Sequence, residues 1–402
     1  MKESLCAKCG ACTSVCPVYQ VTGKETLTAR GRIHLLEKLA AEKHSRDYQQ
    51  IFSKCLLCNA CRSSCPRQID LPAMVIEARQ SFPRLSGNGS FKGMLLKHCL
   101  EHQAILAGLG GLGKLSTPLH KLLPANSGLR LKLGLIDENS PGAEVPPDPV
   151  EPDSPIDNPQ LAIFPGCLAR HLKPEITSGM ISLLSSFGKE RVTIPKEQVC
   201  CGMASHNGGD LEAAQDLARE NISAFGDNDL PIVVPCASCL AQLKDYPAVL
   251  GEDDEWRSLA EKFAARVTDL SSFLAADNHL PPPRSAAKAP LKRVVYHTPC
   301  HLRYQDSAAA ATGQLLKRRP DIELIELDNT PHCCGFGGLF NLAHPKLSDR
   351  IATDLITEII AADPDIVVTD CSGCLIQLHL QLSARGSRIK AQHLVSLLTG
   401  PK

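Results

Sequence analysis

Two short stretches near the start of the sequence decide how this 402-residue chain folds. The first reads Cys6-Ala-Lys-Cys9-Gly-Ala-Cys12-Thr-Ser-Val-Cys16-Pro17. The second reads Cys55-Leu-Leu-Cys58-Asn-Ala-Cys61-Arg-Ser-Ser-Cys65-Pro66. Each contains three cysteines separated by two residues, a fourth cysteine after three more residues, and then a proline. Such a repeated thiol pattern indicates a pair of metal sites.

The spacing is typical of a ferredoxin-type domain that binds two [4Fe-4S] clusters, in which three close cysteines hold one cubane and the fourth holds the other. Zinc is the alternative, but zinc prefers two separated cysteine pairs in a tetrahedron, which these stretches do not offer. The pattern therefore predicts two ligand sets, listed here by cluster: Cys6, Cys9, Cys12 and Cys65, then Cys16, Cys55, Cys58 and Cys61.

Composition narrows the class of protein further. The chain has 43 basic and 43 acidic residues, and its zero formal net charge argues against nucleic acid as a partner. Nineteen cysteines without an apolar leader segment favour metal or redox chemistry in a reducing compartment, which predicts a cytoplasmic location. Aromatic residues make up only 4%, so we expect an aliphatic core.

Proline-rich stretches divide the chain. Residues 138–160 are rich in proline and acidic side chains, and residues 281–290 read PPPRSAAKAP. Both are typical of extended linkers. We therefore predict the following parts: a two-cluster domain at 1–82, a helical connector and linker at 83–160, and cysteine-rich domains at 161–280 and 291–402.

The last two parts are copies of one another. Five cysteines of the first part recur in the second part. The distance along the sequence between corresponding cysteines is the same for three of the pairs and two residues longer for the other two. The words VCCG and HCCG, and IVVPCASCLAQL and IVVTDCSGCLIQL, recur with them. The two sets are Cys167, Cys200, Cys201, Cys236 and Cys239, and Cys300, Cys333, Cys334, Cys371 and Cys374.

Each copy has the same predicted order of strand, helix, strand, helix, strand, which implies a parallel sheet. The predicted strands are 161–164, 191–194 and 232–234, and 293–296, 322–327 and 366–368. The cysteines follow strand ends, so we expect each set to meet at the carboxyl edge of its sheet. The predicted fold class is α+β multidomain, with an α-helical dicluster ferredoxin domain followed by two tandem α/β cysteine-rich domains with parallel sheets.

A ferredoxin-type head followed by two Cys…Cys-Cys-Gly…Cys-x2-Cys domains resembles the iron–sulfur subunit of glycolate oxidase and of FAD-linked D-lactate dehydrogenases. It is similar also to subunits of anaerobic glycerol-3-phosphate dehydrogenase and heterodisulfide reductase. The run Ala29-Arg30-Gly31-Arg32-Ile33 fits the glycolate oxidase type. In heterodisulfide reductases such five-cysteine sets hold a non-cubane [4Fe-4S] cluster, so the resemblance implies one or two further iron–sulfur clusters here.

The resemblance also implies an oxidoreductase complex. A separate FAD subunit would oxidise a 2-hydroxy acid such as lactate or glycolate, and this chain, without catalytic residues of its own, would pass the electrons to a quinone or another acceptor. Both five-cysteine sets are complete, which keeps open a reductase that acts on a disulfide at a non-cubane cluster. A third possibility is a cluster-bearing scaffold that docks redox partners without turnover. For the repeated domains the alternative is that they bind zinc or nothing and act as docking modules.

Weaker signals have ordinary explanations. The GxGxxG run at 108–113 lacks a preceding strand and a following acidic residue, so we reject it as a nucleotide site. The basic segment 83–134 is compatible with peripheral contact at the inner face of the membrane, or with a helical connector. Cys99 fits no site. Two arginines near the cysteines could offset the charge of a cluster or be solvated at the surface: Arg30 and Arg32. Five histidines there could tune a cluster or complete local hydrogen bonds: His171, His206, His297, His301 and His332.

Overall fold

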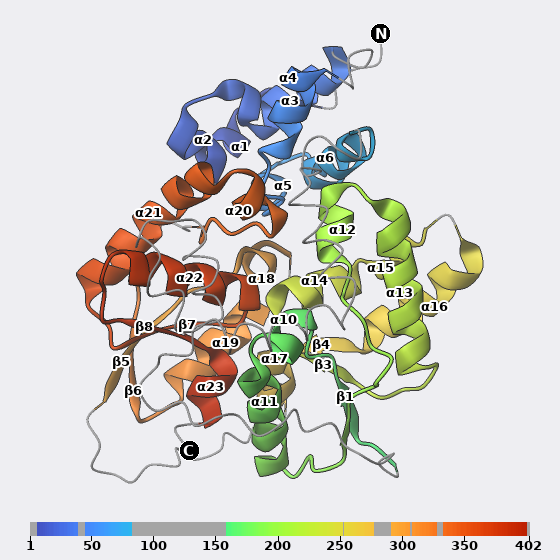
Figure 1. The fold of residues 1–402 in the computed structure, drawn as a ribbon, viewed down its shortest axis with the longest axis vertical. Helices are drawn as coiled ribbons and strands as arrows, with labels where there is room; N and C mark the ends of the chain where they lie inside the picture. The colour runs from blue at the N-terminus through green and yellow to red at the C-terminus, as the bar shows by residue number, and fades with distance from the viewer. Residues whose placement is uncertain are drawn as a thin grey trace, which may run out of the picture.

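The computed structural model describes residues 6–38, 45–82, 158–251, 253–276, 291–305, 308–327 and 333–399. A helical head lies across one end of two α/β units, which pack side by side beneath it (Figure 1). We call residues 6–82 the head, 158–276 the first unit and 291–399 the second unit. This arrangement confirms the predicted fold class. The connector, Cys99, His332 and most of both linkers lie outside the described residues.

The head consists of short helices around its cysteine loops. Its elements are α1 (Ala11–Ser14), α2 (Pro17–Thr22), the 3-10 helix η1 (Glu25–Leu27), α3 (Ala29–Lys38), α4 (Arg46–Ser53), α5 (Ala60–Ser63) and α6 (Leu71–Gln80). Ser45 caps α4 and Asp70 caps α6, each by accepting a hydrogen bond from a backbone N–H in the first turn. Tyr48, Phe52 and Val75 are fully buried and form the centre of a small core.

The first unit has a four-stranded parallel sheet in the order β2-β1-β3-β4. Its elements are β1 (Leu161–Ile163), α10 (Cys167–His171), α11 (Pro174–Ser186), β2 (Val192–Thr193), α12 (Met203–Gly208), α13 (Leu211–Phe225), β3 (Ile232–Val234), α14 (Ala237–Lys244), α15 (Tyr246–Val249), α16 (Asp254–Arg266), β4 (Val267–Asp269) and α17 (Leu270–Ala276). Strands β1 and β3 are buried along their whole length, as expected for a sheet covered on both faces.

The second unit repeats this topology in the order β6-β5-β7-β8. Its elements are β5 (Lys292–Tyr296), α18 (Cys300–Gln305), α19 (Ala308–Lys317), β6 (Ile322–Ile325), α20 (Leu339–Ala343), α21 (Pro345–Ala362), β7 (Ile366–Thr369), α22 (Ser372–Ala384), β8 (Lys390–His393) and α23 (Leu394–Thr399). The strand order reverses between β1 and β3 in the first sheet, and between β5 and β7 in the second. Ligands bind at such a switch point in parallel sheets.

The structure corrects the predicted sheets in one respect. Each has a fourth parallel strand, β4 or β8, that the sequence pattern did not reveal. Strand β8 reads Lys-Ala-Gln-His and has no aliphatic run, so its extended form depends on hydrogen bonds to the buried neighbour β7 rather than on its own composition.

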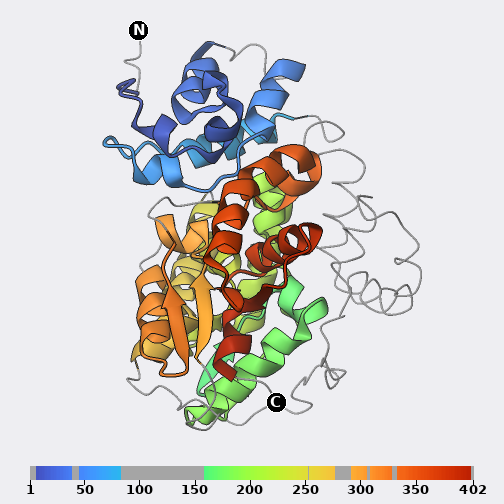
Figure 2. The same ribbon diagram turned by 90° about the vertical axis from the view of Figure 1, so that its left-hand side faces the viewer.

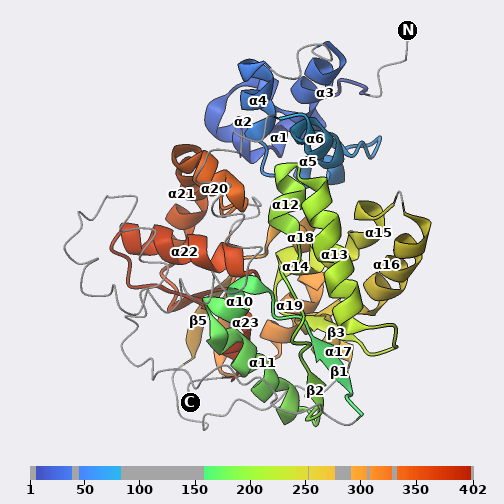
Figure 3. The ribbon, with the colours of Figure 1, turned by 45° about the vertical axis from the view of Figure 1, so that its right-hand side comes forward.

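The two units pack as a pseudo-symmetric pair. Helix α11 of the first unit contacts α23 of the second unit, and α17 of the first unit contacts α19 of the second. Helices α11 and α19 hold the same place in the two units, and so do α17 and α23. The views in Figures 1 and 2 show the head spanning both units. In Figure 3 helix α12 rises to the head, where it contacts α6, while α21 contacts α2. The head is therefore seated on both units at once. Among the described residues no helix has the length and apolarity needed to span a membrane.

Candidate iron–sulfur sites

The two cysteine loops of the head have matching backbone conformations. Lys8 and Gly10 in the first loop, and Leu57 and Asn59 in the second, have positive φ angles of 57°, 84°, 56° and 65°. Alternation of left-handed and ordinary residues turns successive backbone N–H groups to the same side and forms an anion-binding concavity. Leu57 has no glycine-like freedom, so its conformation is held by the surrounding loop. These loops are suited to enclosing an anionic cluster.

The four cysteines predicted for the first cluster share one hollow of about 440 Å³. Cys61, which belongs to the second predicted set, also lines this hollow, so the two sites are neighbours. Arg30 and Arg67 line it as well. We call this hollow head site A: Cys6, Cys9, Cys12 and Cys65.

The second predicted set lies between head site A and the α/β units, and we call it head site B: Cys16, Cys55, Cys58 and Cys61. Burial raises the pKa of the Cys61 thiol, and the nearby sulfurs of the other three members raise it further. Burial also raises the pKa of Cys58, whose neighbours include Cys300 of the second unit. All four cysteines are half-buried, and the raised pKa values of Cys16, Cys58 and Cys61 mean that these thiols need a metal to hold them as thiolates side by side.

Two buried arginines provide the strongest test of fit. Arg32 is 1% exposed and Arg79 is 4% exposed. Within the described parts of the chain, neither forms an ion pair with a carboxylate. The Arg32 guanidinium donates to the carbonyls of Ile51 and Lys54, at 3.2 and 2.8 Å. Buried cations are normally paired, so an anion bound nearby would compensate the charge of these two guanidinium groups.

Head site B can provide that anion. Arg79 donates to the carbonyl of the cysteine Cys55 at 2.6 Å, and to those of Phe52 and Ser53. Burial lowers the pKa of the Arg79 guanidinium to about 10, and the sulfur of Cys55 opposes that shift. Arg32 likewise opposes the burial that raises the pKa of Cys16. A thiolate-ligated cluster has net negative charge, so the residues around head site B fit such a group.

The two arginines named from the sequence have different environments. Arg32 is buried, which removes surface solvation as an explanation for it. Arg30 is partly exposed and forms an ion pair with Glu25 at 2.7 Å. Arg79 was not predicted, because a single arginine near the end of a helix carries no sequence signal of burial.

In the first unit all five predicted cysteines meet at the switch point between β1 and β3. The Sγ atoms of Cys200 and Cys167 are 3.7 Å apart. Cys201 contacts Cys239, and Cys239 contacts Cys236. All but the first member are buried. We call this group repeat site 1: Cys167, Cys200, Cys201, Cys236 and Cys239.

Buried polar side chains fix the Cys-Cys-Gly turn of repeat site 1. Asn221 of α13 donates to the carbonyl of Cys200 at 2.9 Å and accepts from the backbone N–H of Val199 at 3.1 Å. The hydroxyl of Tyr246 donates to the carbonyl of Cys201 at 3.1 Å. Both side chains are completely buried, so this support is independent of solvent.

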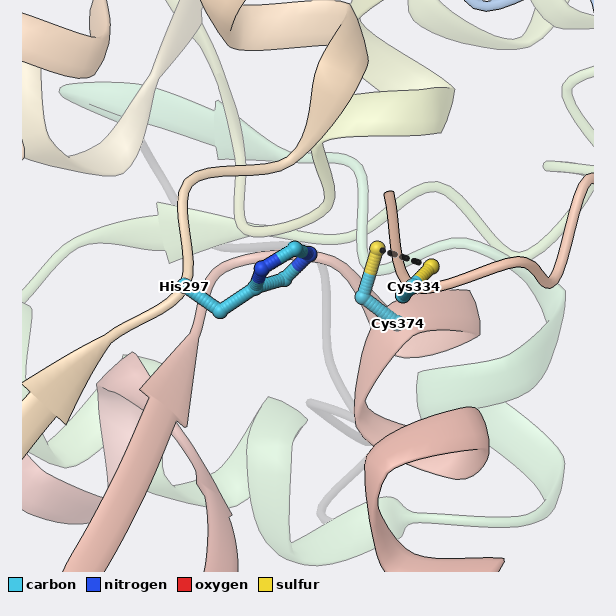
Figure 4. Close-up of side chains that lie close together, drawn as sticks. All are labelled: His297, Cys334 and Cys374. Atoms are coloured by element: carbon cyan, nitrogen blue, oxygen red, sulfur yellow. Dashed lines mark hydrogen bonds between the residues drawn. The ribbon is translucent and has the colours of Figure 1, made fainter. Parts of the chain in front are cut away.

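The second unit forms the corresponding repeat site 2: Cys300, Cys333, Cys334, Cys371 and Cys374. The Sγ atoms of Cys334 and Cys374 are 3.1 Å apart. A ring nitrogen of the buried His297 lies within 4.8 Å of both sulfurs, and Figure 4 shows the imidazole edge directed at them. Three convergent buried groups of this kind suit metal binding, either with all three as ligands or with the histidine hydrogen-bonded to ligand sulfurs.

The histidines predicted as possible tuning groups separate into two classes. His297 lies beside the sulfurs of repeat site 2. His301 reaches the cysteine region through Ser238, whose hydroxyl oxygen is 3.1 Å from its Nδ1 atom. His206 instead contacts Gln242 at 3.3 Å, and burial lowers the pKa of His171. Of the predicted histidines that the structure describes, those of the second unit therefore lie at cysteine sulfurs, and His301 neighbours both Cys334 and Cys236 of the first unit.

The four cysteine groups are contiguous. Head sites A and B meet at Cys61, and Cys58 of head site B is a neighbour of Cys300 and Cys333 in repeat site 2. A hollow of about 380 Å³ lies at that junction. Repeat site 2 then meets repeat site 1 where Cys371 contacts Cys236. The order is head site A, head site B, repeat site 2 and repeat site 1.

A two-cluster head joined to a pair of cysteine-rich α/β units defines a multicluster iron–sulfur protein. Comparison with protein families agrees: residues 3–69 match the 4Fe-4S dicluster domain, and residues 161–244 and 294–379 each match the cysteine-rich domain. The chain belongs to the family of iron–sulfur subunits that includes glycolate oxidase iron–sulfur subunits and lactate utilization protein A.

Individual relatives support this assignment. The probable glycolate oxidase iron-sulfur subunit of Bacillus subtilis is 28% identical over 417 aligned positions, covering 98% of this chain and 92% of the relative. Lactate utilization protein A of Exiguobacterium sp. is 32% identical over 241 positions, covering 60% of this chain and 97% of the relative. That of Geobacillus kaustophilus is 29% identical, with 60% and 98% covered.

Proposed function

We propose that this chain is the electron-transfer subunit of a flavin-dependent 2-hydroxyacid dehydrogenase complex of the lactate or glycolate type. A separate FAD subunit oxidises the substrate, and this chain delivers the electrons to a quinone or another acceptor. The relatives' names as iron–sulfur subunit and lactate utilization protein support the type of complex. The sequence offers no flavin site in this chain, so substrate oxidation is assigned to the partner.

The contiguous row of four cysteine groups is the observation that carries the proposal. Each group contacts or neighbours the next, and the row runs from the head through the second unit to the first. A self-contained catalyst needs one reactive site, whereas a conductor needs closely spaced sites that connect two partners. Eighteen of the nineteen cysteines are used in this row.

The proposed ligands are the cysteines of head sites A and B for two [4Fe-4S] clusters, with further iron–sulfur clusters at repeat sites 1 and 2. Bound clusters supply reversible one-electron uptake and release. The chain's own groups hold the thiolates, exclude water and set the local charge. Arg32 and Arg79 compensate negative charge at head site B, and the buried Asn221 and Tyr246 fix the turn of repeat site 1.

We place the protein in the cytoplasm, because thiolates that bind iron require a reducing compartment. Contact with the inner face of the membrane through the basic segment 83–134 remains a prediction about residues that the structure does not describe.

The test is anaerobic purification of the chain with its native partners. We expect a co-purifying flavoprotein, iron in the isolated chain, and oxidation of lactate or glycolate with a quinone analogue as acceptor. Cys201→Ala and Cys334→Ala should each alter the low-temperature EPR signal of one repeat site and leave the head signals intact. Colourless, iron-free material would refute the proposal, as would a complex without a flavoprotein.

A second candidate is a heterodisulfide-reductase-like subunit that reduces a disulfide at repeat site 2. The hollow between the head and the second unit favours it, since Arg303 and Tyr304 line this hollow beside Cys333. The guanidinium of Arg303 would attract an anionic disulfide to this position. Disulfide reduction by the isolated chain, supplied with reduced electron donor but no flavin subunit, would establish this candidate in place of the first.

A further inference from the structure

The two repeat sites have the same cysteines but different surroundings. When Cys300 is aligned with Cys167, His297 and His301 of the second unit correspond to Phe164 and Leu168 of the first. When Cys371 is aligned with Cys236, Ser238 of the first unit corresponds to Gly373 of the second. In each pair the polar member lies next to repeat site 2. The duplication has therefore kept the ligands and changed the groups that touch them.

His297 provides the first polar contact. Its ring nitrogen lies within 4.8 Å of the sulfurs of Cys334 and Cys374, and it is 4% exposed (Figure 4). Hydrogen bonding from His297 is one of the causes that lower the pKa of Cys334, after the contacts with Cys333 and Cys374 and against burial. The corresponding Phe164 is completely buried and stacks near Phe225, with no proton to donate.

Ser238 provides the second polar contact, and it crosses between the units. Its hydroxyl lies 3.2 Å from the Sγ atom of Cys371, and Nδ1 of His301 lies 3.1 Å from the same hydroxyl oxygen. A metal-bound thiolate has no proton, so the single serine hydrogen must point to sulfur. Nδ1 of His301 then donates to the serine oxygen, which fixes the tautomer of the imidazole.

No equivalent contact reaches repeat site 1 from the matching position. Gly373 carries no hydroxyl, and a Cβ atom there would lie 2.9 Å from the ring of Phe336. Backbone N–H groups approach sulfurs at both sites, those of Gly202, Met203 and Ser372 at repeat site 1 and that of Gly335 at repeat site 2, so the two sites differ in kind through their side-chain donors.

Two other buried ionisable groups lie beside the pair. His393 lies near the sulfur of Cys236 in repeat site 1 and contacts the carbonyl of Pro235. The carboxyl group of Asp370 accepts from the hydroxyls of Tyr296 at 2.9 Å and Thr312 at 3.0 Å.

Hydrogen bonds to cluster sulfurs stabilise the more negative, reduced state and raise the reduction potential. We propose that the repeat sites are redox-inequivalent, with repeat site 2 at the higher potential because His297 and the His301–Ser238 pair donate to its sulfurs. This inference rests on the proposed function, since it requires clusters at both sites. Repeat site 2 lies between the head and repeat site 1. Because of its higher reduction potential, an electron that enters the row would be held at repeat site 2 in preference to repeat site 1.

The test is an EPR-monitored redox titration of the complete chain. Cys334→Ala and Cys201→Ala identify which signal belongs to repeat sites 2 and 1. In the wild-type protein the signal of repeat site 2 should appear first as the potential is lowered. His297→Phe should lower the reduction potential of repeat site 2 by about 59 mV, which for a one-electron couple is a tenfold change in the electron-exchange equilibrium between the two sites. Ser238→Ala should also lower this potential.

Two controls separate tuning from structure. His297→Gln keeps a hydrogen-bond donor and should restore most of the wild-type potential. Phe164→Leu changes the packing at the matching position without adding a donor, and neither step should move. The inference is overturned if both sites contain iron but titrate together or in the reverse order, or if His297→Phe and Ser238→Ala leave the steps unchanged. Absence of iron from the repeat sites would overturn the proposed function along with it.

Discussion

The charge of Arg79 provides a sensitive test of what head site B binds. Its guanidinium is buried, donates to the carbonyls of Phe52, Ser53, Cys55 and Asn207, and has no carboxylate partner among the described residues. Burial lowers its pKa to about 10, against an ordinary value above 12. At 1.36 kcal/mol per pKa unit, the cation costs ~3 kcal/mol in the absence of an anion.

By reciprocity, an anion that offsets this cost is itself stabilised by a similar amount. Replacing Arg79 with methionine should therefore weaken the cluster at head site B by ~3 kcal/mol, which corresponds to about a hundredfold change in an equilibrium constant. The same loss of positive charge should lower its reduction potential. Arg79→Lys keeps the charge with fewer donors, so it should retain most of the cluster and separate charge from hydrogen bonding.

The assay is iron release to a chelator under anaerobic conditions, followed by the EPR signals of the head. Arg79→Met should release iron from head site B about a hundredfold faster if release follows cluster affinity. Arg46→Met is the matched control, because Arg46 is exposed in the first turn of α4 and should leave release unchanged. If Arg79→Met releases iron at the wild-type rate, the guanidinium does not compensate a cluster and the reasoning fails.

Three further predictions concern the units and their contact with the head. Gly209→Ala should destabilise the protein by ~2–3 kcal/mol in urea unfolding. Gly209 has a φ of 85°, and a Cβ atom there would lie 2.5 Å from the carbonyl carbon of Arg79. An unchanged midpoint would contradict this close approach. Asn221→Ala should cost ~2–3 kcal/mol and deplete iron at repeat site 1, since the carbonyl of Cys200 loses its donor; full iron content would argue against that support. Asp370 has a folded pKa of about 7, above its unfolded value near 4, so its stabilising effect is fully present below pH ~4 and is lost as pH rises to 7, with ~2 kcal/mol of the loss falling between pH 5.5 and 8.5. Asp370→Asn should remove this dependence, and thermal unfolding at pH 5.5 and 8.5 would detect its persistence.

Much of the fold could be predicted from the sequence. Thiol spacing predicted the two-cluster head, and the fixed offsets between cysteines predicted the duplication. Aliphatic runs at Leu161–Ile163 and Ile232–Val234 predicted buried parallel strands. The fourth strands β4 and β8 could not be found, because a short polar edge strand is defined by its neighbour's hydrogen bonds rather than by its own side chains.

The surroundings of the sites were less accessible than the cysteines themselves. Arg32 and Arg30 are two residues apart and identical in type, yet one is buried and the other pairs with Glu25 near the surface. Arg79 gave no signal at all. A side chain's burial depends on which distant segment covers it, and local sequence does not record that.

The sequence by itself determined which atoms can bind metal, since ligand chemistry depends on residue type and short-range spacing, and it determined that the α/β unit occurs twice. Only the tertiary structure decided the order of the four cysteine groups, the burial of Arg32 and Arg79 with no acidic partner among the described residues, and the contact of Ser238 with Cys371 across the two units. These features arise from packing between segments far apart in the chain, such as Arg79 with Asn207. Packing of that kind is set by the shape of whole domains, which no short stretch of sequence encodes.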